Sequence, residues 1–173
     1  MDFSSNDYLD AVASECMEHL DALGIPYGDV REFTINRRAK SRWGQCQRRP
    51  DGYHININEA LCDGKHEDGL RGTIFHELIH TCKGCMNHQA KWKEYADIVS
   101  RATGLKVMRT NSAADKGFES NVMPGRKVKY QIFCPNCGLI ATRQKRSRII
   151  KMINRCSCTQ CGSTELYVVE KED

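Results

Sequence analysis

The chain has 173 residues, of which 40 % are hydrophobic and 28 % charged, a composition typical of a folded globular protein rather than a disordered one. This length predicts one ordinary domain, or a domain of about 100 residues with a small module attached. No apolar run approaches the roughly 20 residues that cross a bilayer, and the first ten residues lack a signal-peptide pattern. We therefore expect a protein that is neither secreted nor bound to a membrane.

The formal net charge of +4 is distributed unevenly along the chain. Residues 1–107 carry a net charge of −2 and residues 108–173 a net charge of +6. A polyanionic partner would therefore meet the C-terminal part of the chain.

Residues 5–23 are predicted to form an amphipathic helix, capped by Ser5 or Asn6 and ended by Gly24. The patterns "REFTINR" and "YHININ" alternate as strands do, and we expect a small antiparallel sheet over residues 30–58. Helical periodicity returns over residues 68–82 and again over residues 89–103.

The remaining sequence divides into two parts. Residues 108–126 lack clear periodicity and are interpreted as a linker or flap. The cysteine-rich segment 127–173 follows as a separate small module. The expected organisation is thus α+β, with a main domain over residues 1–107.

The stretch "HELIH" places His76 and His80 four residues apart, so both imidazoles can approach one ion from the same side of a helix. Glu77 lies about 100° further round the helix, where its carboxylate can take a proton from a water molecule. His88 follows a predicted turn and is the preferred third ligand, with Glu94 as the alternative. One alternative is a structural zinc without catalysis, which would leave Glu77 without a purpose. The other is a buried helix with incidental histidines, which would bury polar groups at a high free-energy cost.

Three stretches in order, "KSRWGQC" with "HININEAL", "HELIH" with "NHQAKW", and "CPNCG" with "CTQCG", resemble the SprT-like family of zinc metalloproteases. The resemblance implies a compact zincin-like domain with an HExxH helix. It implies that His76, His80 and His88 bind a catalytic zinc and that Glu77 is the general base. The pair Cys82 and Cys85 departs from the family pattern. For the oxyanion-stabilising group, Tyr53 and His54 are the only candidates that we can suggest.

Five of the ten cysteines lie between Cys134 and Cys161, and the pairs Cys134/Cys137 and Cys158/Cys161 have the spacing of a structural zinc site. A module this small needs a metal to hold it together. We therefore predict a zinc ribbon as the second metal site, with Cys156 as the alternative ligand to Cys158. Four of the remaining cysteines, Cys46, Cys62, Cys82 and Cys85, are interpreted as small buried thiols, with a further metal site as the alternative.

Basic residues in the predicted ribbon are candidates for phosphate binding: Arg143, Lys145, Arg146, Arg148 and Lys151. A second set of basic residues lies within residues 37–49. A solvated protein surface explains these charges equally well, whereas the resemblance to a family linked to DNA repair favours nucleic acid.

Together these features predict a monomeric zinc-dependent endopeptidase, with one catalytic and one structural Zn²⁺. Its substrates would be proteins, including proteins associated with or crosslinked to DNA, in the cytoplasm or at the nucleoid. The alternatives are a nucleic-acid-binding zinc protein with a non-catalytic histidine site, and a zinc hydrolase that acts on a non-peptide amide.

Overall fold

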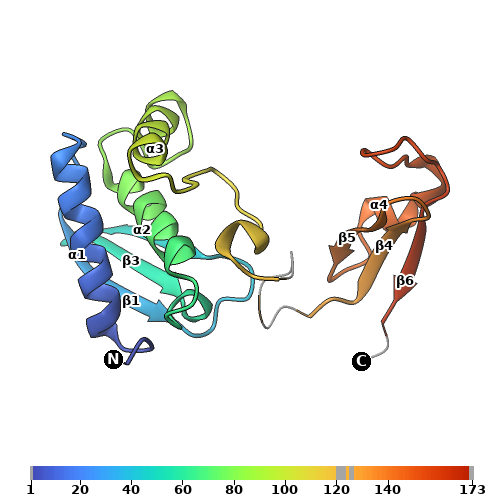
Figure 1. The fold of residues 1–173 in the computed structure, drawn as a ribbon, viewed down its shortest axis with the longest axis horizontal. Helices are drawn as coiled ribbons and strands as arrows, with labels where there is room; N and C mark the ends of the chain where they lie inside the picture. The colour runs from blue at the N-terminus through green and yellow to red at the C-terminus, as the bar shows by residue number, and fades with distance from the viewer. Residues whose placement is uncertain (1, 120–123, 125–126, 172–173) are drawn as a thin grey trace. The chain divides into compact units, whose positions relative to one another are not determined.

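The computed structural model describes residues 2–119, 124 and 127–171 (Figure 1). The chain forms two units, Met1–Pro124 and Gly125–Asp173, each with mixed α+β structure and a small three-stranded sheet. The first unit contains, in order, α1 (Asn6–Ala22), β1 (Val30–Asn36), β2 (Gly44–Arg49), β3 (Gly52–Asn58), η1 (Glu59–Leu61), α2 (Glu67–Thr81), α3 (Ala90–Thr103) and η2 (Ala114–Lys116). The second contains β4 (Tyr130–Cys134), β5 (Gly138–Arg143), α4 (Arg148–Lys151), η3 (Ile153–Arg155) and β6 (Tyr167–Glu170).

Helix α1 begins and ends where the sequence predicts. The Ser5 hydroxyl accepts a hydrogen bond from the backbone N–H of Tyr8, as a helix N-cap does. The predicted apolar stripe is buried against β1 and α2, with Leu9, Cys16 and Leu20 fully enclosed. Helices α1 and α2 lie on the same side of the first sheet (Figure 1).

The first sheet is mixed rather than antiparallel, which corrects the prediction. Its strand order is β1-β3-β2, with β1 and β3 parallel and β2 antiparallel to β3. Strand β3 contributes the fully buried Ile55 and Ile57 and lies in the centre of the sheet. Because the chain passes from β1 to the far edge before the turn at Pro50–Gly52 brings it back, β3 runs in the same direction as β1.

Helix α2 forms the centre of the first unit and is buried along nearly its whole length. It contacts β2 and β3 on one side and α1 and α3 on others. Its first turn carries Glu67 and Asp68, which interact favourably with the helix dipole. The burial of α2 between the sheet and its neighbouring helices fixes the backbone that carries the "HELIH" motif.

The described part of the expected linker or flap packs on the first unit. Lys116, in η2, is only 4 % exposed and lies against α2. The Phe118 ring stacks between Trp43 and His66, with ring centroids 5.2 Å and 3.8 Å away. Residues 120–123, 125 and 126 of the predicted segment lie outside the described residues.

In the second unit, β4 lies between β5 and β6 and pairs with both in antiparallel fashion. The second unit has few buried apolar side chains other than cysteines: Tyr130, Ile132, Ile150 and Leu166. Four of the cysteines take the remaining interior positions and the adjoining turns.

Candidate metal centre and active site

Three imidazoles converge at the C-terminal end of α2. Nε2 of His76 lies 3.2 Å from Nε2 of His80 and 3.1 Å from Nε2 of His88. His76 and His80 come from successive turns of α2, whereas His88 lies in the loop just before α3. The loop at residues 82–88 thus brings the third imidazole to the other two, and ligand atoms of all three lie within 4.8 Å of one another.

The spacing of these nitrogens fits zinc. Nitrogens about 2.0–2.1 Å from a tetrahedral Zn²⁺ lie roughly 3.3 Å apart, close to the distances between the imidazoles. The opposite edges of two rings are held by backbone carbonyls: Nδ1 of His76 lies 2.9 Å from the oxygen of Met108, and Nδ1 of His80 lies 2.8 Å from that of Cys85. Each Nδ1–H can donate to its carbonyl, which leaves the Nε2 lone pair for a metal.

Burial also keeps the imidazoles neutral. Desolvation, together with the neighbouring histidines, lowers the pKa of His76 to about 3. Burial likewise lowers the pKa of His80 and of His88. Because only neutral imidazole binds a metal, protons do not compete for His76 near pH 7.

Trp92, in the first turns of α3, packs against all three imidazoles. Its ring centroid lies 4.8 Å from that of His76, 5.6 Å from that of His80 and 4.5 Å from that of His88. The indole is almost fully buried and restricts rotation of the three rings. The alternative ligand Glu94, two residues later, is exposed on α3 and is not part of the cluster.

Glu77 points toward the edge strand β2, beside the imidazole cluster. Its side chain is buried, and a methyl group added to Gly44 would lie only 2.6 Å from Oε1 of Glu77. Burial raises the pKa of Glu77 to about 7, although the backbone N–H of Cys46 hydrogen bonds to the carboxylate and opposes the rise. A carboxyl group that titrates near neutral pH is suited to general acid–base chemistry.

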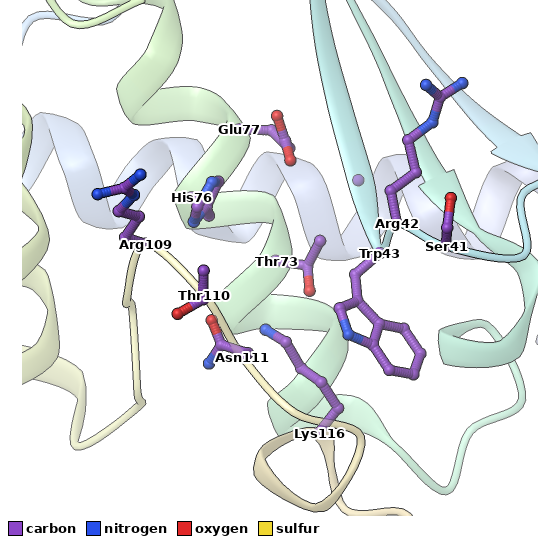
Figure 2. A pocket seen from close by; sticks show the side chains of 11 residues that line it. Ser41, Arg42, Trp43, Thr73, His76, Glu77, Arg109, Thr110, Asn111 and Lys116 are labelled. Atoms are coloured by element: carbon purple, nitrogen blue, oxygen red, sulfur yellow. The ribbon is translucent and has the colours of Figure 1, made fainter. Parts of the chain in front are cut away.

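A cavity of about 260 Å³ opens in front of His76 and Glu77 (Figure 2). Three parts of the first unit line it: residues 41–44, one face of α2, and the segment that contains residues 109–111 and Lys116. Figure 2 shows the Trp43 indole and the Lys116 side chain along one end of this cavity. The reactive groups are therefore reachable by a ligand even though they belong to a buried helix.

Two of the residues suggested from the sequence do not line the cavity. The His54 ring binds Glu32 through Nδ1, at 2.7 Å, and Asp51 through Nε2, at 3.1 Å. The Tyr53 ring lies instead against Gly28. Neither residue lines the cavity in front of His76 and Glu77, so the structure does not place either of them as an oxyanion-stabilising group there.

The second candidate metal site is formed by four cysteines. Sγ of Cys134 lies 3.5 Å from Sγ of Cys161, and Sγ of Cys137 lies 3.9 Å from Sγ of Cys158. Sulfurs about 2.3 Å from a tetrahedral Zn²⁺ would be roughly 3.8 Å apart, so this cluster fits zinc as well. A hydrogen bond from the Ser163 backbone and the neighbouring thiols lower the pKa of Cys161 to about 6, which favours the thiolate.

The other cysteines do not join a metal cluster within the described residues. Cys156 hydrogen bonds to the Met152 carbonyl and is not among the four. Cys62, Cys82 and Cys85 are buried and Cys46 is half-buried, in agreement with their interpretation as packed thiols. Burial raises the pKa of the Cys82 thiol to about 11 and makes it a poor nucleophile.

The candidate phosphate-binding residues lie in the second unit, around β5 and α4. Lys145, Arg146, Arg148 and Lys151 are exposed, whereas Arg143 is half-buried. In the first unit, Arg37 forms an ion pair with Glu59, and Arg49 contacts Gln47 and His54. None of the helices in the described residues combines the length and the apolarity that are needed to cross a membrane.

Sequence reasoning missed Lys116 and the segment around Met108. No local pattern in residues 105–118 indicates that residues 109–111 and Lys116 line the cavity, because the contacts of this segment with α2 are made across more than 30 residues of chain. Gly44 and Trp43 lie in the stretch "KSRWGQC", but the approach of Gly44 to Glu77 and the place of Trp43 in the cavity wall depend on the position of β2.

The fold and the two ligand clusters define a mixed α+β protein with two candidate zinc sites, one of three histidines and one of four cysteines. The family model of the SprT-like family matches residues 15–111, and the chain belongs to this family, with a zinc ribbon at its C-terminal end. Membership suggests a metalloprotease-like function. Comparison with curated proteins gave no match.

Proposed function

We propose that the chain is a zinc-dependent endopeptidase with a zincin-like catalytic unit. The observation that carries this proposal is the buried carboxylate of Glu77, placed beside three converging imidazoles at the wall of an open cavity. A purely structural metal site would need neither the carboxylate nor the cavity. A catalytic zinc site, in contrast, needs three protein ligands and an accessible fourth position.

His76, His80 and His88 would hold the ion through their Nε2 atoms. A bound zinc ion supplies Lewis acidity, which acidifies water and polarises a carbonyl group. Glu77 takes the proton from the attacking water while the new C–O bond forms. It then delivers that proton to the nitrogen of the leaving amine as the C–N bond breaks.

The decisive experiment uses the zinc-loaded full chain and an unfolded protein bait, with the products identified by mass spectrometry. Glu77→Gln should retain zinc and fold but lose cleavage, by about 10²-fold or more. Glu94→Gln, an exposed change on α3, is the matched control and should cleave normally. Unchanged proteolysis by Glu77→Gln would refute the mechanism. Hydrolysis of small amides without peptide cleavage would favour the non-peptide hydrolase.

We further propose that the substrates are proteins held on DNA and that the second unit contacts the phosphates. The exposed cations around β5 and α4 support this proposal, as does the net charge of +6 over residues 108–173. A nucleic-acid-binding protein with a non-catalytic histidine site would use the same cations. The ten free cysteines are consistent with action in a reducing compartment, and we propose a monomer in the cytoplasm or at the nucleoid.

Binding of the full chain to DNA, followed by fluorescence anisotropy at several salt concentrations, tests this part separately. Replacing Lys145, Arg146, Arg148 and Lys151 with Gln should weaken binding and reduce its salt dependence. The same variant should cleave free protein normally but DNA-bound protein slowly. Failure to bind DNA at low salt would refute the DNA proposal and leave the peptidase proposal intact.

A further inference from the structure

Lys116 is a buried cation in the wall of the candidate active site. It is 4 % exposed and lines the same cavity as His76 and Glu77. In Figure 2 its side chain extends into the cavity toward Thr73 and Asn111. The ammonium group therefore faces the space that a substrate would occupy.

The position of Lys116 is fixed by close packing on α2. A methyl group added to Gly69 would lie 2.7 Å from the Lys116 carbonyl oxygen and 3.1 Å from its Cβ. One added to Gly72 would lie 3.7 Å from Nζ. The two glycines are three residues apart on one face of α2, and because they lack side chains they leave room for the lysine to pack on the helix. Phe118, stacked between Trp43 and His66, holds the following residues in place.

The ammonium group has no hydrogen-bond or ion-pair partner among the described residues. The adjacent Asp115 is engaged elsewhere, with Lys106 at 3.1 Å and Ser112 at 2.7 Å. Burial lowers the pKa of Lys116 to about 8, while Asp115 and Glu77 oppose the change, so the group stays mostly protonated at pH 7. A charge that is largely desolvated and has no protein partner carries a free-energy cost, which a ligand of opposite charge in the cavity would offset.

The charges around the cavity also favour an anion. Arg42, Arg109 and Lys116 line it, against the single carboxylate of Glu77. Gly72, next to Nζ, precedes His76 by four residues, which is one helical turn or about 6 Å. A carboxylate on a residue near the scissile bond can span that distance while its backbone stays at the imidazole cluster. The cavity volume of about 260 Å³ suits one side chain rather than a large ligand.

We propose that Lys116 binds a carboxylate of the substrate and makes the enzyme prefer an acidic residue, Asp or Glu, next to the cleaved bond. This inference rests on the proposed peptidase function and specifies its substrate class. A free C-terminal carboxylate has the same chemistry and is the second possible source of the anion. Lys116 would be a specificity-determining residue, with no part in the proton transfers assigned to Glu77.

The test uses the zinc-loaded full chain and a peptide set that differs only at the residues flanking the cleaved bond, with Glu, Gln or Lys there. All peptides have amidated C-termini, and one neutral peptide with a free C-terminus forms a separate arm. The wild type should cleave the Glu peptide about 10- to 100-fold better in kcat/KM than the Gln peptide, as expected for a charge-assisted contact. Preference for the free C-terminus alone would assign the carboxylate to the chain end and overturn the side-chain preference.

Lys116→Met should reduce the Glu/Gln ratio to about 1, and Lys116→Glu should shift the preference to the Lys peptide. Lys65→Met, at an exposed lysine outside the cavity, is the control and should keep the wild-type ratio. Should Lys116→Met lose zinc or fold, Lys116→Gln provides the same comparison. A ratio that stays at the wild-type value in these variants would overturn the inference.

A binding measurement separates this inference from the peptidase proposal. Fluorescence anisotropy of labelled Glu and Gln peptides with the zinc-loaded Glu77→Gln chain does not require cleavage. The Glu peptide should bind about tenfold more tightly, and the difference should vanish when Lys116→Met is added. If the wild type cleaves no peptide, the peptidase proposal fails, whereas equal binding of the two peptides refutes the role of Lys116.

Discussion

Nδ1 of His80 lies 2.8 Å from the backbone carbonyl of Cys85, so the loop that follows α2 orients a ligand that α2 itself carries. The hydrogen bond fixes the ring tautomer and directs Nε2 to the cluster. Cys85 lies between His80 and His88, and the same short loop therefore positions two of the three imidazoles. The affinity of the site for zinc should depend on the conformation of this loop.

A change at Gly84 tests that dependence. Its φ of +84° is in the left-handed region, and a methyl group would meet nothing within 4 Å, so Gly84→Ala introduces backbone strain without a clash. We expect a loss of about 1 kcal/mol in stability and a roughly tenfold loss in zinc affinity. Gly24→Ala, at a φ of +65° with equally open surroundings after α1, should cost similar stability but leave zinc affinity unchanged. Competition with a chromophoric chelator measures the zinc affinity. Equal zinc affinities of Gly84→Ala and the wild type would contradict the role of the loop.

Metal content distinguishes the two clusters. The wild type should bind two zinc ions per chain, and His88→Ala should retain only the ion at the cysteines because two imidazoles hold zinc weakly. His54→Ala, which alters the cluster with Glu32 and Asp51, should retain both ions and normal cleavage. Elemental analysis of the purified variants gives the counts. A full complement of zinc in His88→Ala would remove His88 from the ligand set.

The cysteine cluster should be required for folding of the second unit alone. Cys158→Ser should lose one zinc ion and unfold residues 127–171, because few buried apolar side chains remain to hold this unit together. Cys156→Ser should do neither, since its thiol hydrogen bonds to the Met152 carbonyl and is not one of the four clustered cysteines. Hydrogen exchange followed by mass spectrometry resolves the units separately. Loss of protection in α2 of Cys158→Ser would contradict independent folding.

Glu77 should make the metal-free first unit less stable as the pH rises. Its pKa is raised from 4.5 to about 7, so the native state holds the proton more tightly than the unfolded state. The contribution of Glu77 to stability therefore decreases as the pH rises from about 4.5 to 7. His76, with its lowered pKa, produces the opposite trend, and the informative quantity is the difference between Glu77→Gln and the wild type.

We expect Glu77→Gln to gain roughly 2–3 kcal/mol more relative to the wild type at pH 8 than at pH 5. Urea unfolding of the chelated proteins measures this difference. Trp43 and Trp92 are the only tryptophans of the chain and both lie in the first unit, so their fluorescence reports that unit alone. A difference that does not change with pH would mean that Glu77 is not desolvated.

The metal ligands could be found from the sequence because their spacing reflects local geometry. The pairing of His76 with His80 follows from the pitch of one helix. The turn before His88 follows from the residues between His80 and His88. The four cysteines were recognisable for the same reason, with Gly138 and Gly162 at positive φ in the two turns. Family resemblance and local chemistry agreed on these positions.

What the sequence did not reveal depends on long-range contacts. Strand β2 is rich in Gln and Arg and becomes a strand by pairing with β3, and the direction of β1 relative to β3 is invisible in an alternating pattern. Lys116 resembles any surface lysine until its segment is seen against α2. Tertiary packing alone places it beside Glu77.

All three imidazoles come from residues 76–88, a short span of chain. Closing so short a loop has a small entropic cost, so an ion could be captured before the distant strands have paired. Zinc would then accelerate refolding of the first unit as well as stabilise its final state. An organism short of the metal would in that case accumulate slowly maturing chains rather than finished but inactive ones.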